Sequence, residues 1–167
     1  MIEFMGAMAI GLILSVLALS GFRLYEREMP LRHSAGRLAA AFSTARALAI
    51  SNTGTYSVQV DVKARNFWID ETNSFGEPIV PKVLAPEKLD DTVTLAGIYF
   101  GAQPAPQYGT VTRIRFYSDG SSEDARLYLI LAGANAADPA NFDTVRLYGP
   151  TGASRVFERQ RLALPVK

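Results

Sequence analysis

The sequence predicts an α+β fold in which a long N-terminal helix packs on an antiparallel β-sheet domain. Three observations support this class. An uncharged apolar run opens the chain, an apolar stripe with helical spacing follows it, and beyond Gly54 apolar residues alternate with polar ones as in strands. With 167 residues, 49% of them hydrophobic, the chain suits one globular domain plus one extra element.

The first element is the run from Phe4 to Phe22, which as a helix spans about 28 Å, close to the hydrocarbon thickness of a bilayer. No basic residue precedes it and no A-x-A cleavage pattern directly follows it, so residues 1–22 are predicted to be a retained single-pass anchor rather than a signal peptide. Ala7, Gly11 and Ser15, with Ala18 nearby, form a face on which another helix could approach closely. Small residues are also common in membrane helices generally, and the spacing alone leaves both interpretations open.

Glu3 stands at the threshold of this run. It is either a carboxylate at headgroup level, favoured by the positive end of the helix dipole, or a buried acid that requires a cationic partner within a helix bundle. The residue pattern does not decide between the two.

Residues 23–51 are predicted to continue the helix in amphipathic form, with Pro30 at a kink or a restarted first turn. An apolar stripe should face the globular domain, and Ser51–Gly54 should end the helix. The stripe consists of Leu31, Ala35, Leu38, Phe42, Ala45 and Ala49.

Residues 52–167 are predicted to form the antiparallel domain. Alternation from Tyr56 to Val62 indicates a strand, paired with 66–70 across a turn at residues 63–65. Turn-forming residues at 118–120, 132–141 and 149–152 separate most of the later strands. These are expected at 92–95, 112–117, 125–131, 144–148 and 154–157.

Arg-x-Tyr occurs three times in the predicted strands. Alternation turns Phe116, Leu127 and Leu147 inward and the arginines and tyrosines outward. If the strands are neighbours, they build an exposed face, either an ordinary solvated surface or a contact surface for a subunit or a secreted partner. Its members are Arg115, Tyr117, Arg126, Tyr128, Arg146 and Tyr148.

Catalytic chemistry finds little support. His33 is the only histidine and is expected at the surface, and no cysteine is present to form a disulfide or a nucleophile. Asp119–Asp124 is predicted to be a strand turn rather than a calcium loop. The sequence therefore predicts no enzyme, no cofactor, no metal site and no small-molecule substrate.

Four stretches carry a family resemblance: the opening MIEFMGAMAIGLILSVLAL, FSTARALAISN at 42–52, RIRFYSDGSSEDARLYLIL at 113–131 and TVRLYGPTGASRV at 144–156. They resemble type IV pilins and type II secretion pseudopilins, in particular the minor GspH/FimT branch. The resemblance implies a pilin-like fold and a non-enzymatic subunit of a pseudopilus or pilus. It also implies N-terminal methylation, a bacterial inner-membrane anchor, and a globular domain outside the cytoplasm.

The resemblance further implies that Glu3 docks an incoming subunit by pairing with the N-terminal amine of a neighbour. In the family this glutamate is the fifth residue of the mature chain, after a basic leader that ends in glycine. Here it is third and no leader precedes it, so we expect either a start upstream of the given one or an unprocessed anchor.

DNA binding is the alternative function, because some FimT-type minor pilins bind DNA during uptake through a basic C-terminal G-R-x-R type motif. Gly152-Ala153-Ser154-Arg155 keeps the glycine and the last arginine but has alanine in the place of the first. Arg159 and Arg161 add charge, although Glu158 lies beside them and the net charge of +1 argues against a generally cationic protein. The DNA contacts expected on this interpretation are Arg155, Arg159 and Arg161.

Overall fold

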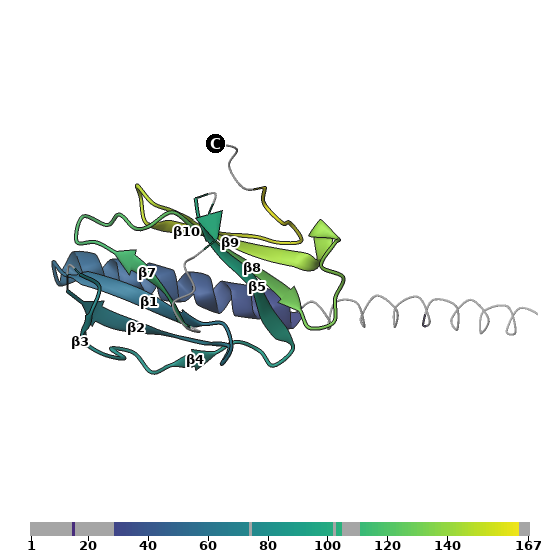
Figure 1. The fold of residues 1–167 in the computed structure, drawn as a ribbon, viewed down its shortest axis with the longest axis horizontal. Coiled ribbons are helices and arrows are strands. Elements are labelled where there is room, and N and C mark those ends of the chain that lie inside the picture. Colours follow the sequence, from purple (N-terminus) through teal and green to yellow (C-terminus); the bar gives the residue numbers. More distant parts are fainter. Residues whose placement is uncertain (1–14, 16–28, 74, 102, 105–110, 164–167) are drawn as a thin grey trace, which may run out of the picture. The chain divides into compact units, whose positions relative to one another are not determined.

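The computed structural model describes residues 15, 29–73, 75–101, 103–104 and 111–163. The chain divides into two compact units, Met1–Pro30 and Leu31–Lys167. The second unit holds all of the strands described below. In this unit a helix packs against two five-stranded antiparallel sheets (Figure 1). Among the described residues, no helix has both the length and the apolar character needed to cross a membrane.

The helix is described over residues 29–51. Every residue of its predicted apolar stripe is at most 6% exposed, which confirms the amphipathic prediction for this part of the chain. The helix ends as expected, since Asn52 and Gly54 donate backbone hydrogen bonds to the carbonyls of Leu48 and Ala49.

The first sheet has the strand order β3-β2-β1-β7, with β4 also paired to β2. β1 and β2 form the predicted hairpin, and Asp61 Oδ1 accepts hydrogen bonds from the amides of Lys63 and Ala64 in its turn. β7 lies on the other side of β1. The strands are β1 (Thr55–Asp61), β2 (Asn66–Thr72), β3 (Pro78–Val80), β4 (Glu87–Lys88) and β7 (Val111–Phe116).

The second sheet has the order β10-β9-β8-β5-β6. Three of its strands run consecutively as a meander, and the register of β5 against β8 shifts between Leu95 and Gly97, as at a β-bulge. A short 3-10 helix, η1 (Pro139–Asn141), lies in the predicted 132–141 loop. The strands are β5 (Val93–Phe100), β6 (Gln103–Pro104), β8 (Ala125–Leu131), β9 (Phe142–Tyr148) and β10 (Ala153–Phe157).

One apolar core joins the helix to the inner faces of both sheets. Phe42 of the helix packs on Phe116 of β7, with ring centroids 5.9 Å apart, and Leu127 of β8 and Leu147 of β9 are fully buried in the same core. Burial of a side chain of this size stabilises a fold by about 1.5–3 kcal/mol. The helix therefore holds the two sheets together.

Every strand predicted from alternation is present, with ends that differ by a few residues. β3, β4 and β6 were not predicted, because two or three residues are too few to show a period of two. β3 and β6 also contain proline, which is typical of edge strands and interrupts a strand pattern in the sequence.

Candidate interaction surface

The predicted assembly residues of the N-terminal run lie almost entirely outside the described residues. Glu3, Ala7, Gly11 and Ala18 are among those not described. Ser15 is helical and exposed. Their roles in assembly and helix packing remain predictions.

The three Arg-x-Tyr motifs do not build one exposed face, so that prediction is wrong. Arg115 lies in β7 of the first sheet and Tyr117 directly follows that strand, whereas the other two motifs lie in β8 and β9 of the second sheet. Strand pairing is set by the path of the chain, and similar strand sequences can enter different sheets.

Alternation itself is confirmed. Phe116, Leu127 and Leu147 point into the core and are fully buried, so the arginines and tyrosines between them point away from it. Pointing away from the core does not mean exposure, because Arg126 and Tyr128 are each only 2% exposed. Both lie on the outer face of the second sheet, where another segment of the chain covers Tyr128.

The covering segment is the chain after β10. The Arg159 amide donates a hydrogen bond to Asp143 Oδ1 over 2.8 Å, Thr144 Oγ1 donates to the Gln160 carbonyl over 2.5 Å, and Tyr128 Oη donates to the Leu162 carbonyl over 2.6 Å. Burial beneath this segment raises the pKa of Tyr128 above its ordinary value, while nearby arginine charges act in the opposite direction. The phenol is therefore held in its neutral, hydrogen-bond-donating form.

A small aromatic cluster lies under this segment. The rings of Tyr99 and Phe142 pack edge-on against Tyr128, with centroid separations of 5.5 and 6.4 Å. The Arg161 guanidinium lies above two of these rings, 5.1 Å from the centroid of Phe142 and 5.7 Å from that of Tyr128. Arg161 thus caps an apolar cluster through cation–π contacts, in addition to its predicted role as a DNA contact.

Next to this cluster, three arginines occupy directly paired positions on three adjacent strands. Arg126 of β8 pairs with Arg146 of β9, and Arg146 pairs with Arg155 of β10. We call these three residues the arginine row. Like charges in such positions lie close together and destabilise a sheet.

The row is only weakly neutralised. Arg146 Nη2 forms an ion pair with Asp124 Oδ2 at 3.7 Å. Arg126 Nη1 donates to the Gly101 carbonyl over 3.0 Å, and within the described structure the buried Nε atoms of Arg126 and Arg146 have no hydrogen-bond partner. The row therefore keeps an excess of positive charge.

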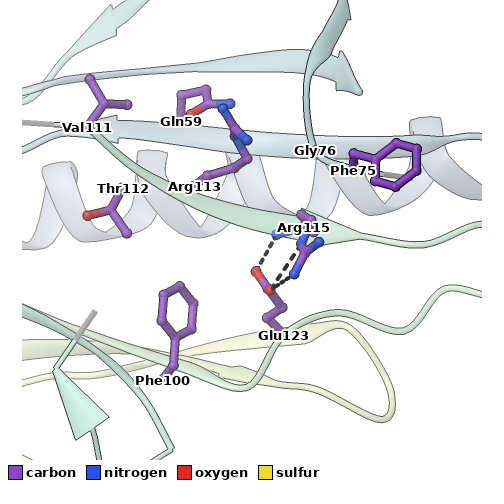
Figure 2. A pocket seen from close by; sticks show the side chains of 9 residues that line it. All are labelled: Gln59, Phe75, Gly76, Phe100, Val111, Thr112, Arg113, Arg115 and Glu123. Carbon is purple, nitrogen blue, oxygen red and sulfur yellow. Dashed lines mark hydrogen bonds and ion pairs between the residues drawn. The ribbon is translucent and has the colours of Figure 1, made fainter. Parts of the chain in front are cut away.

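Arg115 of the first sheet has the opposite environment. Its Nε and Nη2 donate to Glu123 Oε1 over 3.1 and 2.7 Å, and its amide donates to Glu123 Oε2. These side-chain hydrogen bonds, followed by the Glu123 charge, raise the pKa of Arg115. The pair lines a groove of about 630 Å³ beside β7, whose wall also includes Arg113, Phe75 and Phe100 (Figure 2).

The partial G-R-x-R type motif has a structural explanation for its glycine. Gly152 has a φ of +60°, and a Cβ atom there would lie 2.2 Å from the Gly120 carbonyl oxygen. That oxygen also accepts a hydrogen bond from Arg46 Nε of the helix, and Ser154 Oγ donates to the Ala39 carbonyl. Arg155 is the charged residue of this segment that is exposed, and its guanidinium lies over the Phe157 ring.

The predicted turn at Asp119–Asp124 is present. Asp119 Oδ1 accepts hydrogen bonds from the amide and hydroxyl of Ser121, which lower the pKa of its carboxyl. Glu123 is engaged by Arg115, and His33 is exposed on the helix. Across the described residues there is no group of three or more histidine, aspartate or glutamate side chains placed to hold a metal ion.

Comparison with known proteins identifies this fold. No protein-family model and no curated protein matches the sequence. Three solved structures match 81% of the chain at 15% identity: the minor pseudopilin EpsH from the type II secretion system of Vibrio cholerae, with a TM-score of 0.60 and 99% of that chain covered, the type IV minor pilin FimU of Pseudomonas aeruginosa (0.58 and 93%), and GspH of E. coli (0.58 and 95%).

These likenesses are specific to one architecture, a helix packed on antiparallel sheets. The predicted pilin-like α+β fold is therefore confirmed, and with it the structural resemblance to minor pseudopilins and minor pilins.

Proposed function

We propose that the chain is a non-enzymatic structural subunit of a type II secretion pseudopilus or a type IV pilus. The observation that supports this most is the fold, which nearly the full length of the minor pseudopilin EpsH and the minor pilin FimU also adopts. The amphipathic helix comes after the apolar opening run in the sequence. The apolar face of this helix is buried in the domain. Such a chain suits anchoring at one end and presentation of a folded domain at the other.

In this proposal residues 1–22 anchor the chain in the bacterial inner membrane, and the domain lies outside the cytoplasm. On assembly each apolar helix exchanges lipid neighbours for the helices of other subunits, with Ala7, Gly11, Ser15 and Ala18 at the closest approach. Glu3 pairs with the N-terminal amine of a neighbour, because an acid at the edge of the apolar zone is costly alone and tolerable when paired.

The test is Glu3→Ala in the full chain, expressed with its natural assembly machinery. We expect normal membrane insertion, because removal of a charge does not oppose insertion, and a large loss of subunits from the sheared filament or pseudopilus fraction. Glu26→Ala is the matched control, since it removes an equal charge beyond the apolar run. Normal assembly of the Glu3 variant would contradict the proposed pairing.

DNA binding during uptake is the second candidate function. It is favoured by the placement of Arg155 and Arg161, both exposed, on or above the same sheet. Arg159 adds charge, but the adjacent Glu158 forms an ion pair with Arg32 at 3.1 Å. If DNA is the ligand, the full chain in detergent binds duplex DNA with an affinity that falls steeply with salt, and absence of binding at low salt would exclude this function.

A further inference from the structure

The arginine row lies on the outer face of the second sheet, where its like charges oppose one another. Paired positions on neighbouring strands place side chains about 4.5–5.5 Å apart at Cβ. Arg126 is 2% exposed, so its charge acts in a partly desolvated environment where neighbouring charges are felt more strongly. A sheet selected for stability alone would carry apolar or neutral residues here.

In the two more exposed members of the row, an aromatic ring holds the guanidinium group in a fixed orientation. The Arg146 guanidinium lies 4.7 Å from the centroid of the Tyr148 ring, and that of Arg155 lies 5.2 Å from the centroid of Phe157. Stacking on an aromatic ring fixes the plane of a guanidinium while its N–H groups stay available at the edge. Planar donors held in this way suit bidentate recognition of an oxyanion.

The row and the adjacent Asp124 contain buried polar atoms that have no hydrogen-bond partner among the described residues. Nε of Arg126, Nε of Arg146 and Oδ1 of Asp124 are buried without a partner in the described structure. Among the described ion pairs, only that of Arg146 with Asp124, at 3.7 Å, involves a member of the row. One further negative charge at the exposed end would bring the cluster closer to balance.

We propose that Arg146 and Arg155 bind a carboxylate of an acidic segment on another subunit, with buried Arg126 strengthening the local positive potential. The inference rests on the proposed role as an assembly subunit. A protein carboxylate fits better than duplex DNA for two reasons. The row spans only two strand spacings, about 10 Å, and the net charge of +1 provides no broad cationic surface of the kind that neutralises many phosphates.

The experiment measures binding of a fluorescent octaglutamate peptide to the full chain in detergent micelles at low salt. Arg146→Gln with Arg155→Gln should weaken binding about tenfold or more, equivalent to about 1.4 kcal/mol. The control Lys63→Gln with Lys82→Gln removes the same charge from exposed positions outside the row and should leave binding unchanged. Equal losses in both variants would overturn the proposal, because only general charge attraction would then be acting.

Two further arms test the chemistry. Arg146→Lys with Arg155→Lys keeps the charge but not the planar donor pair, so the proposal requires weaker binding, and full retention contradicts it. A short DNA duplex is expected to compete poorly with the peptide. If the DNA displaces the fluorescent peptide at a lower concentration of negative charges than unlabelled peptide does, nucleic acid is the partner and the proposal is overturned.

Failure of this inference and failure of the proposed function give different results. Glu3→Ala should bind octaglutamate normally in micelles, since Glu3 is not part of the row. If Glu3→Ala also assembles normally while the row variants lose the peptide, the assembly role of Glu3 is contradicted and the carboxylate site remains. If the row variants keep the peptide, the site is contradicted whatever Glu3 does.

Discussion

The arginines of the Arg-x-Tyr motifs have opposite electrostatic environments in the two sheets. In the first sheet Arg115 meets Glu123 through two side-chain hydrogen bonds and a backbone contact, so that its charge is neutralised locally. In the second sheet Arg126 and Arg146 lie opposite each other, and the Asp124 carboxylate forms only a loose ion pair with Arg146 at 3.7 Å. The difference teaches that the residues around an arginine in the fold, rather than its own motif, decide whether its charge is neutralised locally or is left available for another molecule.

The largest effect is expected where the second sheet meets the helix. Gly152→Ala should destabilise the fold by about 3 kcal/mol or more, because the new Cβ would collide with the Gly120 carbonyl in addition to the strain of a positive φ. Gly133→Ala has a similar φ of +79° and nothing within 4 Å, so it should cost only about 1 kcal/mol. Chemical denaturation measures both, and equal losses would show that the close approach contributes nothing.

The next effect concerns the segment that covers the second sheet. Tyr128→Phe removes the hydrogen bond to the Leu162 carbonyl and should lower the unfolding free energy by about 1 kcal/mol. Amide exchange should rise in residues 158–163 and stay unchanged in β1 and β2. An increase spread evenly over both sheets would contradict a local role for this bond.

The same tyrosine predicts a dependence on alkaline pH. Because burial raises the pKa of Tyr128 in the folded state, the unfolded chain ionises first. Its contribution to stability is therefore complete below the ordinary tyrosine pKa of about 10 and is lost as the pH rises above it. Stability of Tyr128→Phe should fall less over this alkaline range than that of the wild type, and parallel curves would contradict the prediction.

The smallest expected effect is the difference in coupling free energy between the two arginine–carboxylate pairs. A double-mutant cycle on Arg115 and Glu123, each replaced by alanine, should give a coupling of about 1 kcal/mol, since the contact is bidentate and partly buried. The cycle on Arg146 and Asp124 should give below about 0.5 kcal/mol, because that pair is 3.7 Å apart and partly solvated. If the coupling between Arg146 and Asp124 is stronger than that between Arg115 and Glu123, the charge of the arginine row is neutralised within the chain.

The sequence predicted the core and most of the strands because burial leaves a period in the residue pattern. Leu31, Phe42 and Ala49 fell on one helical face, and Val58 and Val60 on one face of a strand. Alternation also correctly gave the side of the sheet on which Arg126 and Tyr128 lie. These are local properties, and each can be worked out within a single element.

Exposure and pairing could not be predicted in the same way. Whether Tyr128 is exposed depends on Arg161 and Leu162, which contact it from more than thirty positions away in the chain. The separation of Arg115 from Arg126 depends on which sheet each strand enters, and Gly152 is required by a carbonyl at position 120. None of these long-range contacts leaves a periodic signal near the residue concerned.

The most direct test of the central proposal, assembly through the N-terminal run, uses the absence of cysteine from the sequence. A single Gly11→Cys substitution should give disulfide cross-linked species with neighbouring subunits that carry a cysteine at the equivalent position. These species should form in the assembled wild-type background and disappear when Glu3→Ala is added. Cross-linking that is absent during assembly, or that persists at full yield without Glu3, would contradict the account.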